Sequence, residues 1–197
     1  SNYEITYAGG SFSITAQLGT ISNFADLPNK VYGDEAFSLE ATTNSSSPIV
    51  YSIVSGEEFI ELNNGTVTIL GAGSVELQAS VAVSQNYTDI SKSITLTIAK
   101  REVTITTDAK SKVFGATTEP ALTSSVTSGT LKPGDSYELT RALGENVGTY
   151  PITSDLDTSN YEITYAGGSF SITAQLGTIS NFADLPNKVY GDEAFSL

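Results

Sequence analysis

The sequence predicts an all-β chain of tandem β-sandwich domains, and two observations carry this prediction. Threonine, serine, valine, isoleucine and tyrosine fill short runs in which apolar and polar residues alternate, and glycine, asparagine and aspartate separate the runs. Alternation with a period of two is the pattern of a strand that has one buried and one wet face. Residues 1–39 also recur without a single change as residues 159–197. We therefore expect an array of repeats built from strands and turns, without helices.

The repeat predicts near-identical units, because segments that diverge under separate demands do not keep every residue. One period spans 158 residues, the length of one or two ordinary domains. We expect two β-sandwiches, over residues 16–100 and residues 101–173. In this interpretation residues 1–15 are the C-terminal strands of a preceding, truncated copy of the second domain, whose partner strands lie upstream. Residues 174–197 are the N-terminal part of the next copy of the first domain.

Three runs predict strands in the first domain. Asn64-Gly65 precedes the run at residues 66–70, and Asn-Gly supplies the positive φ angles of a tight hairpin turn. Residues 74–79 alternate valine and leucine with glutamate and glutamine, which gives one buried and one wet face. Residues 93–98 alternate in the same way and end the first domain.

A change of phase marks the boundary between the two domains. Apolar residues occupy even positions in the run 93–98 and odd positions in the run 103–106. A slip of one residue sends every side chain of a strand to the opposite face, so the buried face changes across Ala99-Lys100-Arg101. Neither this three-residue connector nor Ala174-Gln175-Leu176 after the second domain contains a Gly-Ser or Pro-rich spacer. We therefore expect stiff coupling of consecutive domains and an elongated rod.

The remaining predicted strands of the second domain lie at residues 137–140, 148–153, 161–165 and 169–173. The two domains also share short motifs, which predicts one sandwich plan that was duplicated and then diverged. The matching motifs are Lys30-Val31-Tyr32-Gly33 with Lys112-Val113-Phe114-Gly115, and Asn86-Tyr87 with Asn160-Tyr161.

Composition excludes much catalytic chemistry. Histidine, cysteine, methionine and tryptophan are all absent, which removes disulfides, thiol nucleophiles, imidazole bases and the commonest transition-metal ligands. Carboxylate pairs of the glycosidase type remain conceivable, but slim sandwiches seldom provide the concave pocket that such a site needs. We therefore predict that the protein is not an enzyme, and we assign no catalytic, cofactor-binding or metal-ligating residue.

The charge and the hydropathy pattern limit the partners. The formal net charge of −13 repels nucleic acid and anionic membranes, so we expect no nucleic-acid partner. No run approaches the roughly 20 apolar residues that a membrane-spanning helix needs, so we expect no membrane span in this window. No secretory leader opens the sequence, and we expect any secretion signal to lie outside it.

Four local features have two interpretations each. Residues 144–148 contain two glycines but lack the Lys-Ser/Thr of a phosphate loop, so a turn is the better interpretation. Asp155 to Asn160 places oxygen ligands at alternating positions that could serve calcium. The loop lacks the glycine and the distal glutamate of an EF-hand, so an acidic turn is the default interpretation.

Lys30 or Lys112 could donate to an internal Lys-Asn isopeptide crosslink, although the spacing does not demand one. Tyr87 and Tyr161 are our candidates for a corner hydrogen bond to the backbone, whereas exposed tyrosines could instead form platforms for sugars.

Four segments of the second domain resemble the MBG domain: residues 112–115, 134–137, 141–152 and 160–165. That family is named for a Tyr-Gly motif, at which this chain has Phe114-Gly115. Residues 19–98 resemble bacterial Ig-like repeats through Tyr32-Gly33, residues 37–39, residues 50–52 and residues 67–73. The resemblance implies tandem Ig-like β-sandwiches from very large bacterial surface adhesins, particularly of the Bacteroidota, including gliding adhesins exported by type IX secretion. It brings no catalytic residues.

Together these features predict a secreted, extracellular structural repeat of a cell-surface adhesin or filament, which extends and presents a distal adhesive domain. Its expected partners are the neighbouring repeats of the same chain, with surface glycans or proteins bound through other domains. The alternative is that each repeat is itself a weak glycan- or protein-binding module and that the array acts through avidity.

Overall fold

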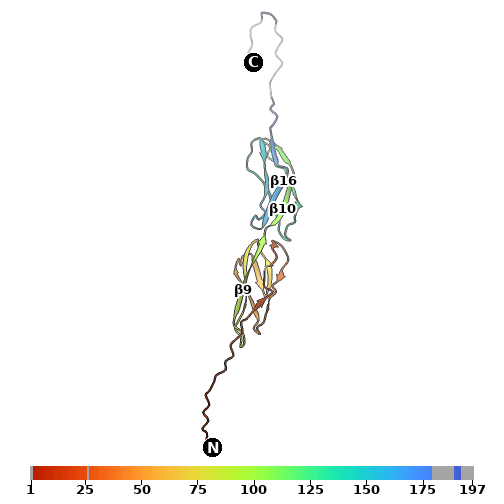
Figure 1. The fold of residues 1–197 in the computed structure, drawn as a ribbon. Coiled ribbons are helices and arrows are strands. Elements are labelled where there is room, and N and C mark those ends of the chain that lie inside the picture. Colours follow the sequence, from red (N-terminus) through yellow and green to blue (C-terminus); the bar gives the residue numbers. More distant parts are fainter. Residues whose placement is uncertain (1, 26, 179–188, 192–197) are drawn as a thin grey trace.

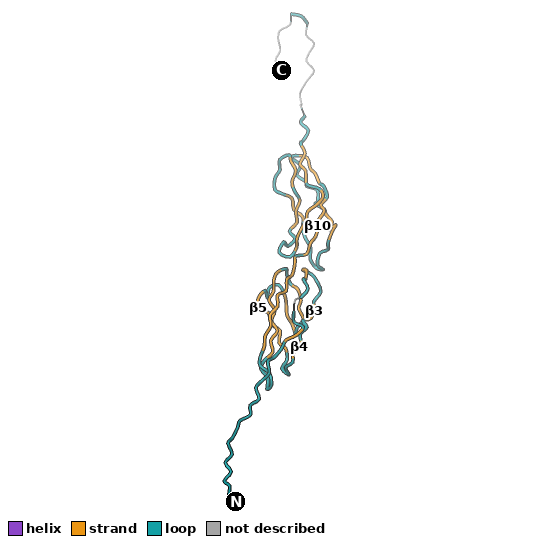
Figure 2. The backbone as a smooth tube through the Cα atoms, in the orientation of Figure 1, coloured by secondary structure: helices purple, strands orange, loops and turns teal. Residues whose placement is uncertain are grey.

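A computed structural model describes residues 2–25, 27–178 and 189–191 of the chain. Its regular elements are strands, and the described part contains no helix, which confirms the predicted all-β class. It therefore also contains no helix long and apolar enough to cross a bilayer. Two groups of strands lie end to end along the chain, and an extended N-terminal segment leads into the first group (Figures 1 and 2).

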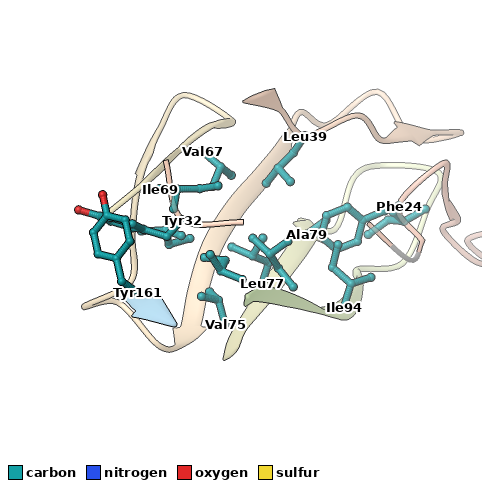
Figure 3. Packing of buried hydrophobic residues seen from close by; sticks show 14 of the residues in the cluster. Phe24, Tyr32, Leu39, Val67, Ile69, Val75, Leu77, Ala79, Ile94 and Tyr161 are labelled. Atoms are coloured by element: carbon teal, nitrogen blue, oxygen red, sulfur yellow. The ribbon is translucent and has the colours of Figure 1, made fainter. Parts of the chain in front are cut away.

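The first group, here called the first sandwich, consists of three antiparallel or mixed sheets. Their strand orders are β2-β9-β8-β5, β3-β7-β6 and β1-β4. The strands are β1 (Ile21–Ser22), β2 (Lys30–Val31), β3 (Phe37–Ser38), β4 (Thr42–Thr43), β5 (Ile49–Ser55), β6 (Ile60–Asn63), β7 (Thr66–Ile69), β8 (Gly73–Val81) and β9 (Ile90–Ala99). Val67, Val75 and Leu77 are fully buried in the core between these sheets (Figure 3).

The hairpin predicted at Asn64-Gly65 is confirmed. Strands β6 and β7 pair with Asn63 opposite Thr66, so the turn contains only two residues. Both have positive φ, 49° at Asn64 and 80° at Gly65, which is the combination that Asn-Gly adopts with little strain.

The second group, here called the second sandwich, contains the sheets β12-β10-β16, β11-β17-β14 and β13-β15. Its strands are β10 (Arg101–Thr107), β11 (Lys110–Val113), β12 (Ser124–Ser128), β13 (Leu139–Arg141), β14 (Gly148–Tyr150), β15 (Ile152–Ser154), β16 (Tyr161–Gly167) and β17 (Phe170–Thr173). Phe170, Ile172 and Ile152 form a small core of their own.

The predicted change of buried face is confirmed. Ile94, Leu96 and Ile98 of β9 are buried, and so are Val103 and Ile105 of β10. The connector is shorter than the three residues expected, since β9 ends at Ala99 and β10 begins at Arg101. Only Lys100 lies outside the strands, because Ala99 still pairs with Val31 and Arg101 already pairs with Tyr161.

Two predicted strands differ in extent. The run 137–140 becomes a strand only from Leu139, because the backbone amide of Glu138 donates to Asp155 Oδ1 (2.7 Å) in place of a strand partner. The run 148–153 is split into β14 and β15, which belong to different sheets. Pro151 lies at the break, as expected for a residue that has no N–H to donate to a ladder.

Among the described residues 2–20 there is no strand. The strands that we predicted in residues 1–15 were expected to pair with strands upstream of this sequence. An isolated parallel bridge joins Gln17 of this segment to Tyr87. The same residues form β16 and β17 in the second sandwich, where β10, β11 and β14 pair with them. In this chain those partner strands are already occupied by residues 161–173.

Candidate functional site: the joint and the ends of the sandwiches

The two sandwiches meet at a joint whose central residues are Tyr32, Arg101, Lys132, Asp135 and Tyr161. Tyr32 follows β2, and Gly33 after it has φ 86°, a value that favours glycine. Arg101 begins β10 and Tyr161 begins β16, while Lys132 and Asp135 lie in the segment between β12 and β13. The joint therefore connects one turn of the first sandwich with three elements of the second.

A pair of tyrosines forms the centre of the joint. The rings of Tyr32 and Tyr161 lie 5.5 Å apart between centroids at an interplanar angle of 82°, an edge-to-face contact (Figure 3). Both side chains are removed from water, with 6% and 2% of their surface exposed. Lys132 Nζ lies 4.5 Å from the centroid of the Tyr32 ring. The apolar core of the first sandwich thus continues through this pair into the second sandwich, where Val103 belongs to the same cluster.

The hydroxyl groups of this pair converge on one carboxylate. Asp135 Oδ2 accepts hydrogen bonds from Tyr161 (2.7 Å) and Tyr32 (3.2 Å). The backbone amide of Lys132 donates to the Tyr161 hydroxyl (2.8 Å). Burial, followed by the hydrogen bond to Asp135, raises the pKa of Tyr161 to about 12. The surroundings at the joint therefore stabilise the neutral form of the Tyr161 side chain.

Further hydrogen bonds hold the two sides of the joint. Arg101 Nε donates across the joint to the carbonyl oxygen of Tyr32 (2.8 Å). Within the second sandwich, Arg101 Nη1 donates to the carbonyl (3.2 Å) and hydroxyl (2.9 Å) oxygens of Thr130 and so fixes the guanidinium. On another side, the backbone amide of Ala72 donates to Asn160 Oδ1 (2.8 Å). Because these contacts come from separate elements, rotation of one sandwich against the other would break several of them together.

The far end of the second sandwich repeats the turn that forms the joint. The amide of Phe114 donates to the carbonyl oxygen of Thr173 (2.8 Å), as the amide of Tyr32 donates to Ala99 (2.9 Å). Gly115 follows with φ 81°. The two motifs that matched in the sequence are thus equivalent in the structure. They differ in burial, because Phe114 is 45% exposed and Tyr32 only 6%.

The near end of the first sandwich repeats the other side of the joint. The amide of Gln17 donates to the carbonyl oxygen of Asn86 (2.7 Å), and Gln17 bridges Tyr87 in a parallel arrangement. At the joint, the backbone amide of Arg101 donates to the carbonyl oxygen of Asn160 (2.9 Å), and Arg101 pairs in parallel with Tyr161. Sequence reasoning noticed both motif pairs but did not assign them to a joint. The available signal was the presence, once in each sandwich, of an aromatic residue before glycine and of an Asn-Tyr pair.

An ion cluster lies in the second sandwich beside Phe170. Lys112 Nζ contacts Glu119 Oε1 (2.9 Å) and Glu145 Oε2 (2.5 Å), and Arg141 contacts both carboxylates. The guanidinium of Arg141 also stacks over the ring of Phe170, at 4.9 Å from its centroid. Hydrogen bonds from Arg141 and then Lys112 lower the pKa of Glu119 to about 2.

Neither candidate lysine faces an asparagine in the contacts of the described chain. Hydrogen bonds to Glu119 and Glu145 raise the pKa of Lys112 and keep its amine protonated, which is the wrong state for an isopeptide donor. Lys30 Nζ lies over the ring of Phe37, at 4.6 Å from its centroid.

The acidic loop from Asp155 to Asn160, for which calcium binding and an acidic turn were the two interpretations, is a hydrogen-bonded turn. Asp157 accepts hydrogen bonds from the amide (2.8 Å) and hydroxyl (2.6 Å) of Ser159 and from Asn160 Nδ2 (2.7 Å). These bonds, the Ser159 hydroxyl first, lower the pKa of Asp157. Asp155 accepts from the amide of Glu138. Within the described residues, no three histidine, cysteine, aspartate or glutamate side chains gather where they could hold a metal ion.

The corner hydrogen bond was assigned to the wrong tyrosines. Tyr161 belongs to the joint, and its hydroxyl bonds to Asp135 and Lys132. Tyr87 bridges Gln17 through its backbone. The hydroxyl that donates to a carbonyl four residues upstream is that of Tyr150, which bonds to Asn146 (2.7 Å). Tyr150 lies on β14, where the chain returns from the loop after β13, so the bond closes that loop.

Comparison with known proteins finds a family model that is similar to part of the chain. Residues 103–171 match the family model of the MBG domain (YGX type). The match lies entirely within the second sandwich and covers about a third of the chain. The fold is also similar to the crystal structure of Drosophila N-cadherin EC1-3, with 14% identity over 81% of this chain and 68% of that chain and a TM-score of 0.29. No curated protein matches the sequence.

Proposed function

We propose that the chain is a structural repeat of a long bacterial cell-surface adhesin or filament, which extends and presents a distal adhesive domain. One observation carries the proposal: the two copies of the 39-residue segment are folded in complementary halves. In the second copy, the residues up to Thr173 form β16 and β17 of the second sandwich. In the first copy, the residues from Gln17 onward belong to the first sandwich. Each half is folded where this chain supplies its partner strands.

The complementary halves fit together into a continuous array. Thr173 is the last residue held by the second sandwich, and Gln175 corresponds to Gln17, the first residue held by the first sandwich. A following first sandwich would therefore start after a connector of one residue, Ala174, just as Lys100 alone connects the two sandwiches in the chain. Connectors of this length leave no room for loosely hinged domains, which supports a rod.

The ends of the sandwiches support the same arrangement. Tyr32 packs on Tyr161 at the joint, and the equivalent residues at the two free ends are Phe114 and Tyr87. We expect Phe114 to pack on Tyr87 of the following repeat and to lose its present 45% exposure. The net charge of −13 would keep neighbouring filaments apart.

A chain that contains two complete periods tests this function by small-angle scattering. Each sandwich with strands of about ten residues adds roughly 30 Å at about 3.3 Å per residue. A second period should therefore lengthen the particle by about 60 Å without thickening it. In the same chain, nuclear Overhauser contacts should join the ring of Phe114 to the ring of the following repeat's Tyr87, as expected for the equivalent of the Tyr32–Tyr161 pair. A compact particle, or the absence of these contacts, would refute the stiff stalk.

The alternative function, in which every repeat binds a glycan or a protein weakly, is tested by a binding measurement. A single soluble period should bind no glycan on an array if the repeat is only a stalk. Reproducible binding to one glycan class would favour the avidity module, and longer arrays should then bind more tightly than single periods.

A further inference from the structure

We propose that the second sandwich is the load-bearing clamp of this chain and that the first sandwich unfolds before it when the chain is pulled from its two ends. This proposal deepens the stalk function and rests on it for the direction of the load, which runs along the chain. The order is decided by how each sandwich pairs the segment through which the chain enters it with the segment through which the chain leaves it.

In the second sandwich, the entering and leaving segments lie side by side and run in the same direction. Strand β10 pairs in parallel with β16 along its whole length, and β11, which follows β10, pairs in parallel with β17. The chain enters this arrangement at Arg101, beside the joint, and leaves it after Thr173, at the opposite end (Figure 1). Tension along the chain therefore pulls the two segments past each other in shear and loads the evenly spaced hydrogen bonds of both ladders together.

A buried threonine connects the two ladders at the point where the strands change sheet. Thr107 is 5% exposed, and its hydroxyl donates to the carbonyl oxygen of Gly168 (2.5 Å). The amide of Gly168 in turn donates to the carbonyl oxygen of Thr107 (2.8 Å). The two segments approach so closely here that a side chain at position 168 would clash with the backbone of Ala109. The ladders are therefore joined across the change of sheet, and shear has to break them as one unit.

In the first sandwich, the entering segment is held in separate short stretches. Among the described residues, Gln17 bridges Tyr87, and the next pairing with the leaving strand β9 is made by the two residues of β2. Between these points the entering segment pairs through β1 with β4, which belongs to another sheet. The entering segment thus has no continuous ladder with β9, and its stretches can release one after another under tension.

The sizes of the two cores predict the opposite order, so the two explanations can be separated. The core of the first sandwich is large and includes Val67, Val75 and Leu77, whereas the core around Phe170 is small. A ranking by buried apolar surface would make the second sandwich the weaker unit. Forced unfolding is governed by the unfolding rate in the pulled direction, and this rate depends on the strands that carry the load.

Single-molecule pulling of the full 197-residue chain from its two ends tests the order. The two events differ in length, because residues 17–99 and 101–173 release roughly 30 and 26 nm of chain at about 3.6 Å per residue. We expect the longer event at the lower force and the shorter event at the higher force. The reverse order, or equal forces, would overturn the proposal.

The outcome is independent of the scattering test of the stalk. A rod-shaped particle of two periods whose second sandwich opens first would refute the clamp and leave the stalk in place. A compact particle that shows the expected order of events would refute the stalk alone.

The direction of pulling provides a control, because the same ladder should resist little when it is unzipped. Glu102 and Glu162 lie opposite each other and are exposed, and the chain has no cysteine of its own, so Glu102→Cys/Glu162→Cys supplies two handles. Force between these handles breaks the ladder pair by pair. We expect the second sandwich to open more than about tenfold faster than under the same force applied from the chain ends. Equal rates in the two directions would show that the ladder is no clamp.

Thr107→Val tests the connection between the two ladders, because it keeps the shape of the side chain and removes the hydroxyl. Under constant force from the chain ends, this variant should unfold the second sandwich about fivefold faster. With the handles at positions 102 and 162 its rate should change little, since the ladder opens first at the handles. Thr164→Val removes an exposed hydroxyl from β16 and should change neither rate. An equal acceleration by Thr107→Val in both directions would be general destabilisation and would overturn the role of Thr107.

Discussion

The same fourteen residues adopt two structures in one molecule. As residues 160–173 they contain β16 and β17, in which Phe170 is 0% and Ile172 2% exposed. As residues 2–15 they form no strand, and Phe12 and Ile14 are 90% and 86% exposed. Local sequence is identical, so propensity and alternation cannot explain the difference. The partner strands explain it, because two strands without neighbours are marginal in water.

Substitution of the matched phenylalanines tests this comparison with the largest expected effect. Phe170→Ala removes a fully buried ring, and we expect it to lower the free energy of unfolding of the second sandwich by about 3–5 kcal/mol. Phe12→Ala removes the same ring from an exposed position and should change stability by less than about 0.5 kcal/mol. Urea unfolding followed by circular dichroism measures both. Equal effects would show that residues 2–15 are as structured as their copy.

The joint provides a second pair of equivalent turns. They differ in whether another sandwich covers them and in the hydroxyl group of Tyr32, which Phe114 lacks. Tyr32→Ala should cost about 3 kcal/mol and uncouple the two sandwiches, so that one thermal transition becomes two. Phe114→Ala, at the half-exposed turn, should cost about 1 kcal/mol in this chain. Differential scanning calorimetry separates the two outcomes. A single transition in Tyr32→Ala would mean that the tyrosine pair does not couple the sandwiches.

The sequence predicted those features that depend on neighbouring residues. The Asn64-Gly65 turn and the change of buried face after Ile98 were correct because each is set by a few consecutive residues. The joint was missed, since Tyr32 and Asp135 are 103 positions apart and their contact exists only after both sandwiches fold. Tyr161 was assigned to a corner because its sequence context shows a tyrosine before a strand, and only the packed structure places it against Tyr32.

Alkaline pH should weaken the joint through Tyr161. Its pKa is raised from the ordinary value of 10.0 to about 12, so the folded state favours the neutral phenol. The stabilisation is complete below pH 10 and is lost as the pH rises toward 12, with a maximum of about 2 kcal/mol. Tyr161→Phe should be less stable at neutral pH and show a smaller loss above pH 10. Thermal unfolding between pH 8 and about 11 measures the difference. Parallel curves for both proteins would exclude Tyr161 as the cause.

Acidic pH should act on the surroundings of Phe170, which its copy Phe12 lacks. Arg141 stacks on Phe170 and binds Glu119, whose pKa is lowered from 4.5 to about 2, so the folded state favours the carboxylate. The contribution of Glu119 is therefore present above pH 4.5 and is lost as the pH falls toward 2. This effect should be the smallest of the four predicted here, because the side chain of Glu119 is 39% exposed and salt screens such ion pairs.

Glu119→Gln should flatten the decrease of the melting temperature between pH 5 and about 2.5, and 1 M sodium chloride should reproduce part of that change. If the glutamine variant keeps the full decrease, the ion cluster does not hold Arg141 over the ring, and packing alone fixes β17 between β11 and β14.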